Sequence, residues 1–164
     1  MFSRTDLDLL NDASFVDWRY CGSYPGLHYA VFPQYAFSVP DSEQTIRITR
    51  APKRPGDNGL QFWVSAENAD SPPAAHDRRT RDRRAAQAAN YFRSANFRDI
   101  NEAEFSSIVR RQCADLLAKP VLPLHEPQRF IGAIAMYAME ADFIVSLVAE
   151  YADEFIHFYW ESTA

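Results

Sequence analysis

The sequence predicts a single α+β domain over residues 1–164. Alternating apolar and polar residues in the N-terminal half predict an antiparallel sheet, and helical periodicity in the middle third predicts about three helices. Dense β-branched and aromatic residues near the C-terminus predict a β-hairpin. A chain of 164 residues with 47% hydrophobic residues can bury one core without disulfides or metal. This composition excludes a chain that is disordered throughout.

The first elements expected are a short helix and two strands. Thr5 is a suitable cap for the helix. Residues 15–20 and 27–32 alternate between apolar and polar side chains, and the glycines and proline of residues 22–26 separate them. We therefore expect these two runs to be antiparallel neighbours in the sheet.

The clearest local signal is a predicted hairpin over residues 44–66. Residues 45–49 and 60–65 both alternate, and between them Asn58 and Gly59 can adopt the positive φ angles of a tight turn. The pattern predicts that apolar residues of both strands face the core.

The outer face of this predicted hairpin carries Arg47 and Trp63. If both are exposed neighbours, they are suited to cation–π stacking, or to binding a carboxylate on a partner. Helices packed over this face would remove that surface.

A polar, proline-containing segment over residues 67–80 predicts a surface loop before the helices. The first helix is expected over residues 81–94. The second begins at Asn101, with Glu104 three residues later as in a capping box, and is expected to end before Pro120.

The third helix is expected over residues 127–141, because apolar residues recur there at helical spacing. Residues 143–148 and 155–160 are rich in β-branched and aromatic side chains, and residues 151–154 can reverse the chain. These features favour a C-terminal hairpin. One long helix is the alternative, because apolar residues from 130 to 158 also recur at spacings of three and four.

Charge is distributed unevenly along the chain, whose net charge is −5. Residues 1–46 and 120–164 are acidic, whereas residues 47–119 are basic. An acidic protein repels nucleic acid at long range, although a local basic patch can still bind phosphate.

The sequence predicts a cytoplasmic protein. Its N-terminus lacks a basic start and an apolar signal segment, and prolines interrupt the longest uncharged stretch, residues 20–40, so no transmembrane helix is expected. The only cysteines, Cys21 and Cys113, are far apart and fit reduced thiols better than a disulfide or a zinc site.

Catalytic motifs are absent from the sequence. A hydrolase or transferase that uses His28 with Cys21 is one alternative function, but no spacing supports it. Glu154 and His157 have a Glu-x-x-His spacing, yet a carboxylate-bridged metal site needs a second pair. We therefore expect no metal and no cofactor.

A cluster of arginines gives a second alternative, a small nucleic-acid-binding protein. An anionic partner would explain why these cations precede a predicted helix, although nearby aspartates can neutralise them and no aromatic residues interleave them. The candidate anion-binding residues are Arg78, Arg79, Arg81, Arg83 and Arg84.

The leading prediction is a non-enzymatic protein-binding module, such as an inhibitor or immunity-type protein that neutralises a basic partner. The C-terminal segment combines acidic residues, which would steer a basic partner, with aromatic residues, which would anchor it. The candidate partner-binding residues are Glu150, Asp153, Glu154, Tyr159, Trp160 and Glu161.

Overall fold

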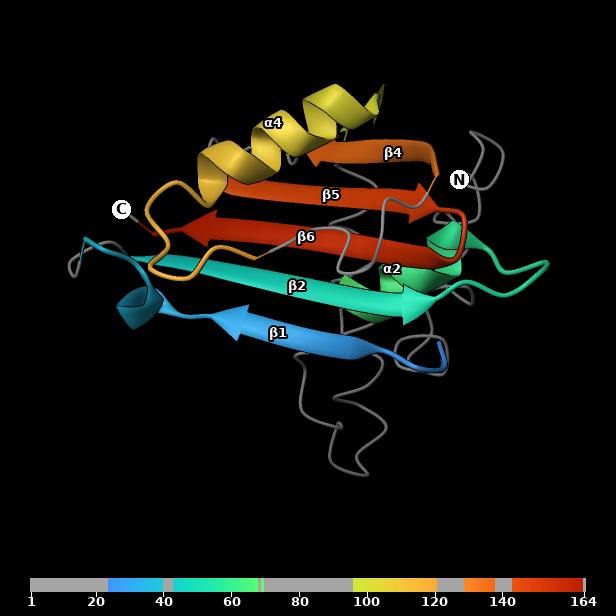
Figure 1. Cartoon of the computed structure of the whole chain (residues 1–164), viewed down its shortest axis with the longest axis horizontal. Coiled ribbons are helices and arrows are strands. Elements are labelled where there is room, and N and C mark those ends of the chain that lie inside the picture. Colours follow the sequence, from blue (N-terminus) through green and yellow to red (C-terminus); the bar gives the residue numbers. More distant parts are fainter. Residues whose placement is uncertain are drawn as a thin grey trace.

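The structure is a computed structural model that describes residues 24–39, 43–67, 69, 96–120, 129–137 and 143–163. These residues form six strands, two α-helices and one short 3-10 helix (Figure 1). In chain order they are β1 (His28–Phe32), η2 (Gln34–Ala36), β2 (Gln44–Pro52), α2 (Gly59–Glu67), β3 (Asn96–Ile100), α4 (Glu102–Gln112), β4 (Phe130–Tyr137), β5 (Ile144–Tyr151) and β6 (Glu154–Ser162).

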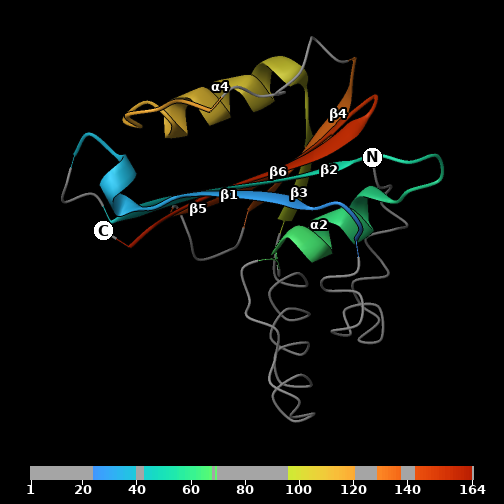
Figure 2. The same cartoon turned by 60° about the horizontal axis from the view of Figure 1, so that its bottom comes forward.

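The six strands form one sheet in the order β1-β2-β6-β5-β4-β3, and every neighbouring pair is antiparallel. Helix α4 lies over one face of this sheet and α2 over the other (Figure 2). The predicted α+β class is wrong in its proportion of strands to helices and in where the strands lie along the chain. The sheet dominates, it takes four of its strands from the second half of the chain, and the described residues contain two α-helices rather than about three.

The predicted hairpin over residues 44–66 is right in its first strand, β2, and wrong in its second, because residues 60–65 lie inside α2. Asn58 begins this helix instead of forming a turn. Its side-chain Oδ1 accepts a hydrogen bond from the N–H of Leu60 at 2.8 Å, and its carbonyl accepts one from the N–H of Phe62 at 3.2 Å. The chain reverses at Gly56, whose φ is 85°.

The predicted helix over residues 127–141 is wrong, because Phe130–Tyr137 forms β4. Residues 133–136 of this strand are buried in succession. Covering both faces of a strand removes the apolar and polar alternation that marks a strand in a sequence. The continuous apolar run that remains also contains helical spacings, so periodicity alone misassigned it.

Two other predicted elements are confirmed. Helix α4 begins at Asn101, whose Oδ1 accepts a hydrogen bond from the N–H of Glu104 at 2.9 Å. It ends at Gln112, however, well before Pro120. The C-terminal hairpin is formed by β5 and β6, so the alternative of one long helix is wrong.

Residues 27–32 were predicted to be a strand, and they contain β1, which pairs with β2. Its predicted neighbour over residues 15–20, the helix after Thr5 and the helix over residues 81–94 lie outside the described residues. Most of the loop predicted for residues 67–80 also lies outside the described residues. Its first residue, Glu67, belongs to the helix α2 instead.

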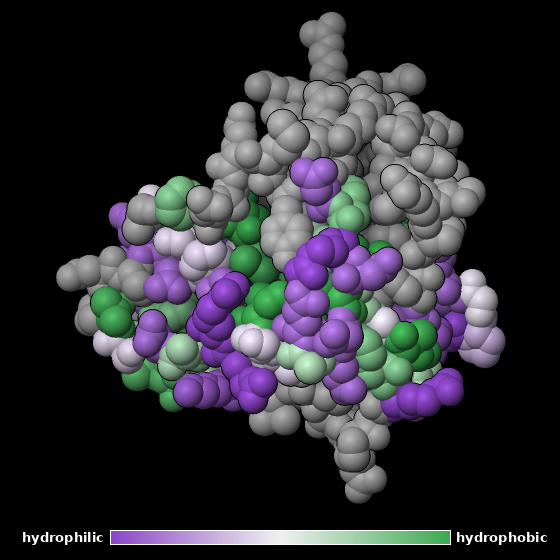
Figure 3. Space-filling view, turned by 90° about the horizontal axis from the view of Figure 1, so that it is seen from above, coloured by the Kyte–Doolittle hydropathy of each residue, from purple (hydrophilic) through white to green (hydrophobic). Residues whose placement is uncertain are grey.

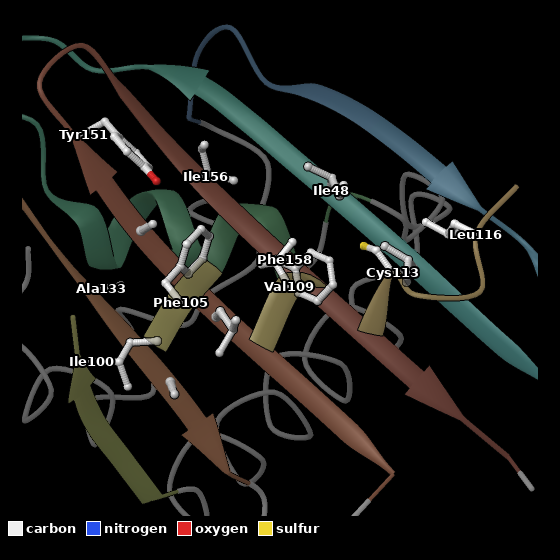
Figure 4. Packing of buried hydrophobic residues seen from close by; sticks show 14 of the residues in the cluster. Ile48, Ile100, Phe105, Val109, Cys113, Leu116, Ala133, Tyr151, Ile156 and Phe158 are labelled. Atoms are coloured by element: carbon white, nitrogen blue, oxygen red, sulfur yellow. The ribbon is translucent and has the colours of Figure 1, made fainter. Parts of the chain in front are cut away.

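The hydrophobic core has one cluster on each face of the sheet. Under α4, Phe105 and Val109 pack against Ile156 and Phe158 of β6, and the Cys113 thiol lies at the end of the same row (Figure 4). Burial raises the pKa of this thiol to about 11, so it is protonated at neutral pH.

The cluster on the other face lies under α2. There Phe62 stacks on Phe155 of β6 at 5.3 Å between ring centroids, and Tyr24 contacts both rings edge-on. Among the described residues, none of the helices has the length and apolar character needed to cross a membrane.

Candidate functional site

A buried polar cluster lies on the α2 face of the sheet, and it consists of Trp63, Glu67, Ser146 and His157. One carboxylate oxygen of Glu67, Oε1, accepts hydrogen bonds from Trp63 Nε1 at 3.0 Å and from Ser146 Oγ at 2.7 Å. The same oxygen lies 3.1 Å from His157 Nε2, which is also 2.9 Å from Ser146 Oγ. The three side chains of Glu67, Ser146 and His157 therefore form a closed triangle.

Strand alternation and one helix end bring this polar cluster together. In the β5–β6 pair, Ser146 lies opposite Tyr159 and His157 lies opposite Val148, so Ser146 and His157 are diagonal neighbours on one face. Glu67 is the last residue of α2, and Trp63 lies one turn earlier on the same side of that helix.

Burial by itself would raise the pKa of the Glu67 carboxyl. The positive charge of His157 and the hydrogen bonds from His157, Ser146 and Trp63 act more strongly in the opposite direction, so the pKa is lowered. Glu67 is therefore held as a carboxylate inside the fold, and it forms an ion pair with His157 whenever that ring is protonated.

The polar cluster contains the residue types of a serine hydrolase triad without its geometry. In such a triad the serine donates its proton to one ring nitrogen of histidine, and the acid binds the other. Here Ser146 donates its proton to Glu67, so its contact with His157 requires the histidine Nε2–H to donate. Ser146 and His157 are 1% and 2% exposed. The polar cluster therefore differs from a triad in its hydrogen-bond directions, and its serine and histidine are shielded from solvent.

Arg47 lies elsewhere on the same face and not beside an exposed Trp63 as predicted. Its guanidinium stacks over the ring of Tyr159 at 4.0 Å from the centroid, whereas Trp63 is buried on α2. The Tyr159 hydroxyl donates a hydrogen bond to Glu161 at 2.9 Å. Burial, and then the charge of Glu161, raise the pKa of Tyr159.

Two of the six predicted partner-binding residues are buried in ion pairs. Glu150 accepts from Lys53 Nζ at 2.5 Å, and Glu154 pairs with Arg50. Both carboxylates are therefore neutralised within the fold, which leaves them little charge with which to attract a partner.

The other four predicted residues differ in exposure. Tyr159 is buried, Trp160 and Glu161 are half-buried, and Asp153 is exposed in the turn between β5 and β6. Asp153 and the pair of Trp160 and Glu161 lie at opposite ends of β6. The structure thus does not bring the six residues together on one surface.

The residues of the two alternative functions are placed only in part. His28 is exposed on β1, whereas Cys21 and the five candidate arginines lie outside the described residues. Glu154 and His157 point to opposite faces of β6 because they are an odd number of residues apart. In the described part of the chain, no group of three or more metal-binding side chains is found.

A surface that the sequence did not reveal lies at the end of the sheet where η2 meets the loop after α4. We call it the end patch, and its residues are Gln34, Tyr35, Phe37, Ser38, Val39 and Leu117. Five of them line an open hollow of about 520 Å³. Tyr35 is 83% exposed and Leu117 is 71% exposed, the highest values among the large apolar side chains described.

Sequence reasoning missed both the polar cluster and the end patch, because each brings together residues that are far apart in the chain. Leu117 has the spacing of an inner helical residue, and only the early end of α4 places it in a loop. Glu67 and Ser146 are 79 residues apart in sequence, so no local motif joins them.

Comparison with protein-family models, with curated proteins and with solved structures gave no match for this chain.

Proposed function

We propose that this protein is a non-catalytic protein-binding module whose contact surface is centred on the end patch. One observation carries the proposal: Tyr35 and Leu117, which are far apart in sequence, are both largely exposed around one hollow. Contiguous exposed apolar surface is costly in water, and it marks interaction sites in stable proteins.

Backbone hydrogen bonds join the two segments of the end patch. The N–H of Leu117 donates to the carbonyl of Ala36 at 3.0 Å, and the N–H of Ser38 donates to the carbonyl of Asp115 at 2.7 Å. Between these bonds, Phe37 and Leu116 form a β-bridge and are both buried. Because the backbone beneath Tyr35 is already ordered, binding a partner there costs little conformational entropy.

The partner we propose is a basic protein. The net charge of −5 attracts cationic proteins at long range and speeds their encounter. Trp160 and Glu161 of the predicted partner-binding set lie at the end of β6, at the same end of the sheet as η2 (Figure 1). They would therefore border the contact, and an inhibitor or immunity-type protein would act by covering its partner's own functional surface.

Affinity capture with matched variants tests this proposal. The tagged protein is compared with the Tyr35→Ser/Leu117→Ser double variant and with Ile131→Ser, whose wild-type side chain is 42% exposed on β4, away from the end patch. We expect the wild type and Ile131→Ser to capture one stoichiometric basic protein, and the double variant to lose at least about tenfold in affinity, as for an interface hot spot.

Two results would contradict the proposal. One is equal capture by all three proteins, which would locate the contact elsewhere. The other is capture of nucleic acid alone that is released by salt, which would favour the arginine cluster instead. Circular dichroism of each variant shows whether a loss of capture reflects binding rather than unfolding.

A further inference from the structure

An apolar groove of about 230 Å³ lies over strands β1 and β2, on the α4 face of the sheet. Ala30 of β1 and Ile48 of β2, which are opposite each other in the strand pair, line it together with Phe32 and Pro120. None of its described lining residues belongs to the end patch. What binds in the groove is therefore independent of the proposed function.

One end of the groove carries a charged side chain. Arg50 lines the groove there and lies opposite His28 in the β1–β2 pair. Most of the other described lining residues are apolar, whereas hydrophilic residues cross the middle of the side of the molecule near α4 and β4 (Figure 3). An apolar groove with a few polar groups at fixed positions is typical of a small-molecule site.

Arg50 keeps hydrogen-bond donors for a ligand. Its Nη2 donates to the carboxylate of Glu154 in an ion pair, and both side chains are mostly buried. The Arg50 side chain makes no other hydrogen bond with the described residues, and its Nε is buried without a partner among them. Because a guanidinium carries five N–H groups, an acceptor placed beside Arg50 would gain a charge-assisted hydrogen bond.

The charges around Arg50 favour an uncharged ligand. Glu154 already neutralises the guanidinium. Burial, and then the charges of Glu102 and Glu154, raise the pKa of Tyr151 to about 12, so a second carboxylate acts on this part of the α4 face. An anion bound beside Arg50 would meet more negative than positive charge, and its burial would be costly.

We propose that this groove binds a small uncharged molecule made of an aromatic ring and one hydrogen-bond acceptor, such as a carbonyl group. The ring lies against Ala30 and Phe32, and the acceptor accepts a hydrogen bond from Arg50. An apolar cavity of about 150 Å³ holds one benzene ring, and the groove has about 230 Å³. The additional volume accommodates the substituent that carries the acceptor.

Acetophenone is the probe for this class, and NMR titration of the full chain measures its binding. We expect a Kd of about 1 mM or below, with shifts in the signals of Ala30 and Ile48. Ala30→Leu fills the groove and should weaken binding at least about tenfold. Ala103→Leu, the same substitution at an exposed position of α4, should bind as the wild type does. No saturable binding by the wild type, or equal binding by the two variants, would overturn the proposal.

Cumene and benzoate, which are close to acetophenone in shape, test the role of Arg50. Cumene lacks the acceptor, and benzoate is an anion. Arg50→Met/Glu154→Leu replaces the ion pair with apolar side chains, a change that folded proteins often tolerate. It should weaken acetophenone binding at least about fivefold, the value of one hydrogen bond, without weakening cumene binding. The wild type should bind benzoate more weakly than acetophenone. Equal losses for acetophenone and cumene, or tighter binding of benzoate, would overturn the proposed ligand class.

Discussion

Both faces of the sheet bury apolar side chains, but their polar groups differ. The α4 face holds the Arg50–Glu154 ion pair, and the α2 face holds the polar cluster. On the α4 face, β6 contributes Ile156 and Phe158 to an apolar cluster. On the α2 face, the same strand contributes Phe155 to an apolar cluster and His157 to the polar cluster. A buried histidine and carboxylate are tolerated there because they bind each other, whereas apolar side chains need only fill the space.

Phe158→Ala should give the largest loss of stability, because it opens a cavity in the apolar cluster under α4. Phe158 is fully buried, and truncation of such a residue costs about 3–5 kcal/mol of the unfolding free energy. Urea denaturation measures this loss. Phe158→Leu serves as the control and should lose much less, since most of the volume is retained. A loss below about 1 kcal/mol would show that this face repacks freely.

His157→Phe should give the next largest loss, because it removes a hydrogen-bond partner from the buried Glu67 carboxylate. Leaving a buried charged group without such a partner costs about 1–3 kcal/mol or more. The double variant His157→Phe/Glu67→Leu removes both partners and should recover part of the loss, which a double-mutant cycle measures. Additive effects of the two substitutions would contradict the energetic link within the polar cluster.

The polar cluster should also make the unfolding free energy depend on pH. The pKa of Glu67 is lower in the folded protein than in the unfolded chain, so its contribution is complete above the unfolded value, near 4.3. The contribution is lost as pH falls through the folded value. One such group changes the unfolding free energy by at most about 1.4 kcal/mol per pH unit.

Urea denaturation between neutral and acidic pH compares the wild type with Glu67→Gln. The variant should be less stable at neutral pH and should lose less stability on acidification. Phe158→Leu, which changes only the apolar face, should retain the pH dependence of the wild type. Equal pH dependence in the wild type and Glu67→Gln would show that this carboxyl is not stabilised by its neighbours.

Asn101→Ala should give the smallest loss of stability, and it tests the N-terminal cap of α4. The substitution removes the hydrogen bond from the N–H of Glu104 to the cap, at a cost of about 1 kcal/mol. Thermal unfolding measures it, and Asn101→Asp, which can still accept that bond, should remain close to the wild type. A loss as large as that of Phe158→Ala would mean that the cap orders more than α4.

The sequence predicted the elements whose signals are local. Asn101 and Glu104 mark the start of α4 through a hydrogen bond between residues only three positions apart. The density of β-branched and aromatic residues over 155–160 marks the strand β6. Sequence reasoning failed where burial on both sides hides the period, as in β4, and where Asn58 serves equally well as a turn residue or a helix cap. Acidic residues that look available for a partner, such as Glu150, proved to be paired with a cation that is distant in sequence.

By itself, the sequence favoured a strand over residues 155–160, with one long helix as the alternative, and the side chains of any strand alternate in two rows whatever surrounds it. Only the tertiary structure decided that both rows would be buried, that Glu67 would meet Ser146 and His157, and that Leu117 would stand exposed beside Tyr35. These outcomes depend on contacts between residues that are far apart in the chain. The geometry of such contacts follows from how the helices and strands pack, and local patterns carry no information about it.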